Sequence, residues 1–294
     1  MTGSRGEGLV LKSLSGFHYV QASDGEVYEC RLRGKIRARV LTGDQVVYTT
    51  LENNRGVIEE ILPRSTQLYR PPIANVSMLF IVLAYARPRP SLMALDRLLI
   101  MAEWHGLESC IVMNKSDLTP EPEAVSIIEY YPQIGYQLLQ TSALNGQGVE
   151  ELTGVVGNSI AVLAGPSGAG KSSLLNLMLP DVSLEIQEVS RKLGRGRHTT
   201  RHAELFSLHE GGWIADTPGF SALELPRMKR EELAMHFIEF QEPASGCRFA
   251  DCLHHQERDC GVKEAVNRGE IASFRYENYV SILGEVIEKE RSYQ

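Results

Sequence analysis

A glycine-rich run in the middle of the chain has the pattern of a phosphate-binding loop. It follows an apolar segment over 159–164 and precedes a segment of helical character, which is the context that the pattern requires. Backbone amides of such a loop surround a phosphate, and the positive end of the next helix adds to the attraction. Lys171 is expected to reach the β- and γ-phosphates, and Ser172 to bind Mg²⁺. The expected phosphate-binding residues are Gly165, Pro166, Ser167, Gly168, Ala169, Gly170, Lys171, Ser172 and Ser173.

A second polar motif, at 114–117, indicates which base accompanies the phosphates. It ends an apolar segment, at the position where ligands bind in open parallel sheets. The Asp117 carboxylate can accept hydrogen bonds from the ring N–H and the amine of guanine, a pairing that adenine does not offer. Alone, the motif also fits a helix cap, but the Ser-Ala pair at 142–143 could present an amide to the guanine oxygen. The expected residues for GTP or GDP are Asn114, Lys115, Asp117, Ser142 and Ala143.

Two further segments could sense the terminal phosphate. Asp216 ends the apolar segment 213–216 and suits a Mg²⁺ role, usually through water, while the Gly219 amide can meet the γ-phosphate. A stretch rich in basic residues, between this motif and the phosphate loop, contains Thr199 and Thr200. A threonine here is expected to bind Mg²⁺ and the γ-phosphate together, so that the stretch orders only with triphosphate bound. Thr200 is favoured and Thr199 is the alternative.

Three of the five cysteines cluster toward the end of the chain, around a histidine. Cys247, Cys252, His254 and Cys260 supply three sulfurs and one imidazole, a complete tetrahedral set for one structural Zn²⁺. The adjacent His255 is an alternative imidazole ligand. Because no coordination position stays open, we expect the metal to stabilise a small domain rather than to catalyse a reaction.

The elements that must position these residues follow from the hydrophobic pattern. Short β-like runs separated by turn signals fill residues 8–62 and predict an OB-type β-barrel, a fold that commonly binds single-stranded nucleic acid. Apolar segments then alternate with helices, which predicts a parallel sheet covered on both faces. Two helices are expected within 262–290. The expected domains are a barrel over 1–70, a central α/β phosphate-loop domain over 71–225, and a mostly helical zinc-binding domain over 226–294.

Composition and charge narrow the class of protein. The chain is 43% hydrophobic and 23% charged, as in folded globular proteins. Its longest apolar run falls far short of the about 20 residues that a membrane helix needs, so we expect no membrane partner and a cytoplasmic location. The net charge is -7, although residues 1–70 carry +2. Within that region Arg31, Arg33, Lys35, Arg37 and Arg39 would form one cationic stripe facing RNA if the segment were a strand; a strand edge kept soluble by its charge is the alternative.

The motif order resembles that of the circularly permuted GTPases, because base recognition precedes the phosphate loop. With the barrel and the Cys/His cluster, the chain resembles the bacterial ribosome-small-subunit-dependent GTPase A family (RsgA/YjeQ) along essentially its whole length. The resemblance implies hydrolysis of GTP to GDP and phosphate, stimulated by the small (30S) ribosomal subunit during its late maturation. It also implies binding to 16S rRNA as a monomer.

Two departures from related enzymes bear on catalysis. Phe220 follows the Asp-Thr-Pro-Gly motif, where Ras-like enzymes carry the glutamine that orients the attacking water. Isolated hydrolysis should therefore be slow, and His198 is a candidate catalytic residue beside Thr200 and Lys171, although an ordinary surface histidine is the alternative. Gly168 replaces the asparagine of potassium-activated relatives, so the motif does not support a potassium site.

Two other functions fit parts of the pattern. An RNA-binding assembly factor could hold nucleotide as a structural ligand only. A nucleotide kinase would fit the phosphate loop, but it leaves the 114–117 motif unexplained.

Overall fold

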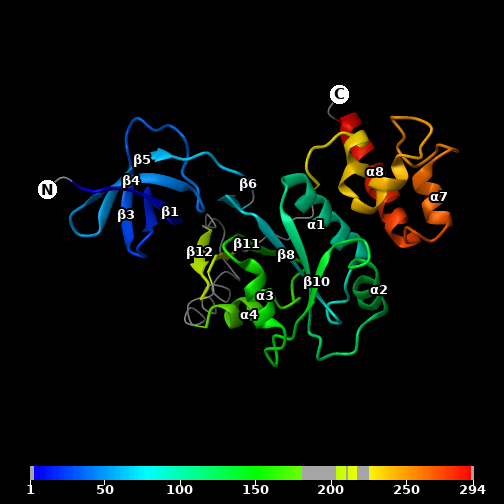
Figure 1. Ribbon diagram of the computed structural model, residues 1–294, viewed down its shortest axis with the longest axis horizontal. Helices are drawn as coiled ribbons and strands as arrows, with labels where there is room; N and C mark the ends of the chain where they lie inside the picture. Colours follow the sequence, from blue (N-terminus) through cyan, green and yellow to red (C-terminus); the bar gives the residue numbers. More distant parts are fainter. Residues whose placement is uncertain (1–2, 70, 181–202, 210, 217–224, 293–294) are drawn as a thin grey trace.

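The computed structural model describes residues 3–69, 71–180, 203–209, 211–216 and 225–292. Figure 1 shows three parts in a row: an N-terminal barrel, a central sheet with helices, and a helical C-terminal part. The predicted residues His198, Thr199, Thr200 and Gly219 lie outside the described residues.

The N-terminal part is a closed barrel, as predicted. Strand β1 pairs with both β2 and β4, and β3 pairs with β5, so the order β1-β2-β3-β5-β4 returns to β1. Alternate apolar residues, including Val10, Val20, Cys30 and Ile58, fill its core. The strands are β1 Arg5–Leu14, β2 Phe17–Ala22, β3 Val27–Leu32, β4 Gln45–Leu51 and β5 Arg55–Ile61.

The cationic segment that follows β3 is not a strand, so the predicted stripe on one strand face is wrong. Strand β3 ends at Leu32, and the Ile36 N–H donates to the Arg33 carbonyl in a turn. All five cations are nevertheless exposed, on β3 and the loop after it: Arg31, Arg33, Lys35, Arg37 and Arg39.

The central sheet is largely parallel, with strand order β10-β9-β8-β11-β13-β12. Each adjacent pair is parallel except β12–β13. A short hairpin of β6 and β7 leads into it from the barrel. The strands are β6 Gln67–Tyr69, β7 Pro72–Ala74, β8 Met78–Ala84, β9 Glu108–Asn114, β10 Gln137–Gln140, β11 Ile160–Ala164, β12 Glu204–Ser207 and β13 Trp213–Asp216.

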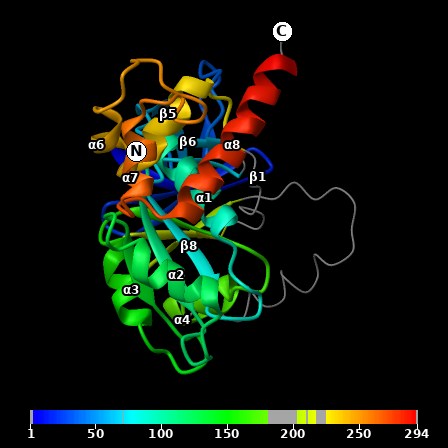
Figure 2. The same ribbon diagram turned by 90° about the vertical axis from the view of Figure 1, so that its right-hand side faces the viewer.

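Both faces of this sheet are covered by helices. Its central strands β8 and β11 are apolar and buried at every position, so water is excluded from both faces. In β8, Leu79, Ile81 and Leu83 enter one core cluster, whereas Phe80 and Val82 enter the other. The first cluster contains residues of helices α1 and α2, and the second contains residues of α3 and α4. Figure 2 shows these helices around strand β8. The helices are α1 Leu92–His105, α2 Pro122–Tyr130, α3 Val149–Val156 and α4 Lys171–Met178.

The C-terminal part is helical and packs on α1. It includes the two helices expected within 262–290, and its core takes in Ile100 of α1. The helical segments are η1 Arg230–His236, η2 Ile238–Phe240, α6 Gln241–Ala244, α7 Gly261–Asn267 and α8 Ser273–Ser292. Among the helices of the described residues, none combines the length and apolar character needed to cross a membrane.

The barrel is packed against the central sheet rather than only tethered to it. Leu9 of β1 belongs to the same core cluster as Ile73 and Leu205. Strand β1 also pairs with β12, which makes one continuous sheet of eleven strands through both parts. The orientation of the barrel is therefore fixed by packing and by backbone pairing.

A buried ion network joins α8 to α1. The Arg275 side chain is 0% exposed and forms ion pairs with Asp96 of α1, at 2.5 Å, and with Glu239 of η2, at 2.6 Å. Asn278 and Tyr131 donate further hydrogen bonds to Asp96. These contacts hold the C-terminal part to the central domain, since charges this deep are tolerated only when they are paired.

We expect Arg275→Met to lower the free energy of unfolding by about 3 kcal/mol, because Asp96 and Glu239 would stay buried without their cation. Denaturant unfolding followed by circular dichroism measures the loss. The control is Arg268→Met, which removes an ion pair with Glu270 whose side chains are 54% and 55% exposed; it should cost under about 1 kcal/mol. Equal losses in the two variants would contradict the network's role.

Candidate active site and metal centre

Within the described residues, three of the predicted nucleotide-binding segments meet at one edge of the central sheet. Four consecutive strands of the sheet all run parallel, in the order β9-β8-β11-β13. Their carboxyl ends therefore lie along the same edge. The motif at 114–117 follows β9, the phosphate loop follows β11, and Asp216 ends β13. The edge of carboxyl ends is where ligands bind in sheets of this kind.

Two glycines give the phosphate loop its shape. Gly165 has φ +133° and a side chain there would begin 2.1 Å from the Val82 carbonyl oxygen of β8. Gly170 has φ +99°, and its added Cβ would lie 2.1 Å from Nδ2 of Asn114. The close approach of loop, sheet and base motif therefore requires glycine at both positions.

Lys171 begins α4 and turns back over the loop. Its Nζ donates to the carbonyl oxygens of Gly165, at 2.7 Å, and of Pro166, at 2.9 Å. Burial lowers its pKa from the ordinary value, and the two carbonyls offset part of that cost. Ser167, Gly168, Ser172 and Ser173 are exposed around it, so an anion can reach both the ammonium and the start of the helix.

Asn114 joins the base motif to the phosphate loop. Its buried side chain donates from Nδ2 to the Ala169 carbonyl at 2.9 Å. Its Oδ1 accepts hydrogen bonds from Thr141 Oγ1, at 3.2 Å, and from the Ala143 N–H, at 3.1 Å. Three loops are thus held at fixed spacing, and one amide hydrogen of Asn114 is left for a ligand. The Ala143 amide, predicted to meet the guanine oxygen, donates to Asn114 in this structure.

The other residues of the base motif also lie together. Lys115 Nζ donates to the Gly168 carbonyl at 2.7 Å and to the Arg87 carbonyl. Asp117 accepts a hydrogen bond from the buried Ser142 hydroxyl at 2.5 Å, which orients its carboxylate. Because Asp117 is exposed, its second oxygen can face a base. The carboxylate is therefore both oriented and accessible.

Two residues that sequence reasoning missed help to build this edge. Thr141 is buried and bonds Asn114, and the Arg87 carbonyl, after β8, holds Lys115. The available signal was position: both residues follow the carboxyl ends of strands in the same parallel sheet.

The remaining predicted residue of the edge is Asp216. It ends β13, and its backbone pairs with Glu204 of β12. Strand β13 lies next to β11, the strand that precedes the phosphate loop. Its strand position places it on the same edge as the phosphate loop, since β13 and β11 are parallel.

The four predicted metal ligands converge in the C-terminal part. Their ligand atoms all lie within 4.8 Å of one another. Cys247 and Cys260 sulfurs are 3.8 Å apart, and each is 3.4 Å from Nδ1 of His254. Tetrahedral Zn²⁺ with bonds of about 2.3 Å to sulfur separates two sulfurs by about 3.8 Å. The spacing therefore suits zinc.

The surrounding residues fix the histidine of this cluster. His254 is 4% exposed, and its carbonyl accepts a hydrogen bond from Tyr276 Oη at 2.8 Å. The neighbouring Leu253 carbonyl accepts one from Tyr279 Oη at 2.8 Å. His255, the alternative ligand, is exposed and stands outside the cluster, so the imidazole comes from His254.

Comparisons with known proteins agree with this arrangement. The RsgA GTPase family matches residues 61–226, and the RsgA N-terminal domain matches residues 7–58. The chain is 48% identical over 290 residues to the small ribosomal subunit biogenesis GTPase RsgA of Moorella thermoacetica, covering 98% of this chain and 99% of that protein. It is also 48% identical to the protein of the same name from Carboxydothermus hydrogenoformans, covering 97% and 99%.

Two solved structures share the fold. YjeQ from Thermotoga maritima has a TM-score of 0.85 and 39% identity, over 97% of this chain and 99% of that one. YloQ, described as a circularly permuted GTPase, has a TM-score of 0.83 and 36% identity, over 97% and 96%. The predicted fold class and permuted motif order are confirmed, and the chain belongs to the RsgA GTPase family of GTP-hydrolysing enzymes.

Proposed function

We propose that this protein hydrolyses GTP to GDP and phosphate in the late maturation of the small ribosomal subunit, and that the subunit stimulates the reaction. The observation that carries the proposal is the Asn114 side chain, which bonds the phosphate loop at Ala169 and the loop at Ala143. That contact holds base recognition and phosphate binding in one site. The relatives' names, small ribosomal subunit biogenesis GTPase, support the process.

Seven of the predicted site residues have a specific chemical role in this proposal. Lys171 binds the β- and γ-phosphates, Asp117 reads guanine, and the Gly219 amide meets the γ-phosphate. Ser172, Thr200 and Asp216 would hold Mg²⁺, which supplies charge neutralisation at the phosphates when bound. His198 is the candidate for positioning the attacking water. The exposed Ser172 at the start of α4 fits the metal role.

The Cys/His cluster is proposed as a structural Zn²⁺ site. Three sulfurs and one imidazole fill a tetrahedral set, so no position stays open for substrate. Cys247 and Cys252 pack against a core cluster made of residues from the C-terminal part and from α1. The metal therefore stabilises the part of the chain that we assign to a domain over 226–294, after the barrel domain (1–70) and the GTPase domain (71–225).

The exposed cations on β3 and the loop after it are the proposed contact with 16S rRNA, since phosphate contacts need accessible positive charge. We further propose that the protein acts as a monomer in the cytoplasm. Removing the charges of Arg31, Arg33 and Lys35 should flatten the salt dependence of subunit binding. An unchanged slope would assign these cations to solubility alone.

Turnover measured with and without small ribosomal subunits tests the function. Stimulated release of phosphate from GTP is the expected result. Binding of nucleotide without turnover under both conditions would favour the RNA-binding assembly factor, and phosphoryl transfer to GMP would favour a kinase.

Asp117→Asn should weaken GTP binding by about 10- to 100-fold, because the carboxylate would no longer accept two hydrogen bonds from guanine. Xanthosine triphosphate should bind this variant better than GTP, since its base offers an oxygen to the new amide. Competition with a fluorescent nucleotide measures both affinities. Ser142→Ala is the companion variant: it removes only the hydroxyl that orients Asp117 and should keep the preference for guanine. Unaltered base preference in Asp117→Asn would count against the assignment.

A further inference from the structure

The barrel touches the central sheet at the start of β12, beside the nucleotide edge. Lys12 of β1 pairs with Glu204 of β12, and Lys12 Nζ lies 2.7 Å from a Glu204 carboxylate oxygen. Nearby, the buried Thr42 hydroxyl donates to the Ala203 carbonyl at 2.9 Å. These contacts join residues that are 192 and 161 positions apart in the chain.

The same register continues to the active-site edge. Glu204 pairs with Lys12 on one side and with Asp216 of β13 on the other. Only one strand, β12, therefore separates Lys12 from Asp216. Neighbouring strands are about 4.8 Å apart. A shift of β1 relative to β12 would therefore be felt at the end of β13, where the proposed function places Mg²⁺ and the γ-phosphate.

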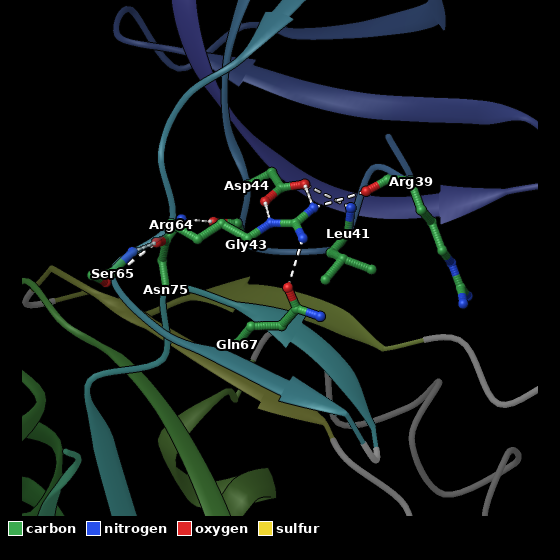
Figure 3. Close-up of polar contacts among 8 residues, drawn as sticks. All are labelled: Arg39, Leu41, Gly43, Asp44, Arg64, Ser65, Gln67 and Asn75. Atoms are coloured by element: carbon green, nitrogen blue, oxygen red, sulfur yellow. Dashed lines mark hydrogen bonds and ion pairs between the residues drawn. The ribbon is translucent and has the colours of Figure 1, made fainter. Parts of the chain in front are cut away.

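The barrel loop that carries Thr42 is held firmly on its other side. Asp44, with a fully buried side chain, pairs with Arg64 at 2.6 Å and accepts a hydrogen bond from the Leu41 N–H at 2.7 Å (Figure 3). Asn75 Nδ2 donates to the Gly43 carbonyl at 2.8 Å. The loop thus cannot move independently of the segment that leads into β8.

Gly43 shows how close the two parts of this junction lie. Its φ is +87°, and an added Cβ would be 2.1 Å from the Ala74 carbonyl oxygen. The Ala74 N–H donates to the Thr42 carbonyl at 2.9 Å. Thr42 therefore lies between β7 and Ala203, the residue before β12, with a backbone hydrogen bond on one side and its hydroxyl bond on the other.

We propose that Lys12 and Thr42 are positioning residues for the triphosphate site: they hold β12, and through Glu204 they hold the end of β13 at Asp216. The inference rests on the proposed role of Asp216. Packing of Leu9 fixes the barrel, whereas the half-exposed Lys12–Glu204 pair contributes little to stability. The ion pair instead sets the position of β12. A displacement of the barrel by a bound RNA would therefore shift the γ-phosphate end of the site. By linkage, triphosphate changes the affinity of the barrel for that RNA by the same factor.

The test is a charge swap across the two strands. Lys12→Glu, Glu204→Lys, the double variant and Thr42→Val are compared for affinity to GDP and to a non-hydrolysable GTP analogue, without subunits. The single variants should lose about three- to fivefold in affinity for the analogue with unchanged GDP affinity. The double variant should recover, because the opposite charges are restored. Arg268→Glu, at the residue after α7, is the control for a lost surface ion pair and should alter neither affinity.

Subunit-stimulated turnover provides the second readout. Lys12→Glu and Glu204→Lys should each lower the ratio of stimulated to basal turnover, and the double variant should restore it. A parallel loss of GDP and analogue affinity, or no recovery in the double variant, would overturn the inference. Thermal unfolding midpoints equal to that of the wild type separate positioning from misfolding. A wild-type protein that subunits do not stimulate would contradict the proposed function, whereas the two nucleotide affinities would still decide the inference.

Discussion

Lys171→Ala is expected to lower the kcat for GTP hydrolysis by at least about 1,000-fold, because it removes the half-buried positive charge that we propose binds the phosphates. Lys171 Nζ already lies inside the loop, within hydrogen-bonding distance of the Gly165 and Pro166 carbonyls. A bound triphosphate would take over those contacts. Phosphate release under saturating GTP, with small ribosomal subunits present, measures the loss.

Lys289→Ala provides the matched control for this variant. Lys289 lies on α8, in the C-terminal part, so its loss should leave basal turnover at the wild-type level. Guanine affinity gives a second comparison: Lys171→Ala should still prefer guanine over adenine, because Asp117 and Ser142 are intact. Wild-type turnover in Lys171→Ala would refute the phosphate-loop role.

Removing the metal is expected to have the largest effect on stability. Structural zinc in small domains contributes about 10–16 kcal/mol of apparent binding free energy at neutral pH. Cys260→Ser should therefore abolish stoichiometric zinc and unfold the segment around Cys247 and His254. Part of the C-terminal core, which includes Phe237, Phe240 and Tyr279, should persist and limit the loss to that segment. Zinc determination and hydrogen exchange over 247–260 measure the two effects.

Cys110→Ser is the control for the metal site. Cys110 is as buried as Cys260, at 0% exposure, but it lies in β9 outside the cluster. It should retain full zinc while paying an ordinary cost for a buried hydroxyl. Retention of stoichiometric zinc by Cys260→Ser would show that the cluster does not hold the ion as proposed.

The architecture was predictable from the sequence because its signals are local. The all-apolar run of β8 predicts a strand buried on both faces, and both faces are indeed covered. The metal ligands also follow from spacing, since His254 lies seven residues after Cys247 and six before Cys260 along the chain. Such features depend on neighbours in sequence and survive without knowledge of the fold.

The features that the sequence did not predict depend mainly on contacts between residues far apart in the chain. Asn114 appears as a base-binding residue in its motif, but its bond to Ala169 depends on a loop 55 positions later. The alternating cations after Leu32 mimic a strand, yet a turn forms at Arg33, and Ile36 and Val40 pack on the barrel core from a loop. The pairing of Lys12 with Glu204 is equally invisible before the two parts of the sheet are assembled.

The shared core at Leu9, Ile73 and Leu205 has a practical consequence for work with fragments. A truncated chain that starts after the barrel would expose this apolar patch to water and leave β12 as an open edge strand. Exposed edges of this kind recruit other chains and promote aggregation. Poor activity of such a fragment would then report on self-association, and substitutions at the junction are the cleaner way to separate the contributions of the two parts.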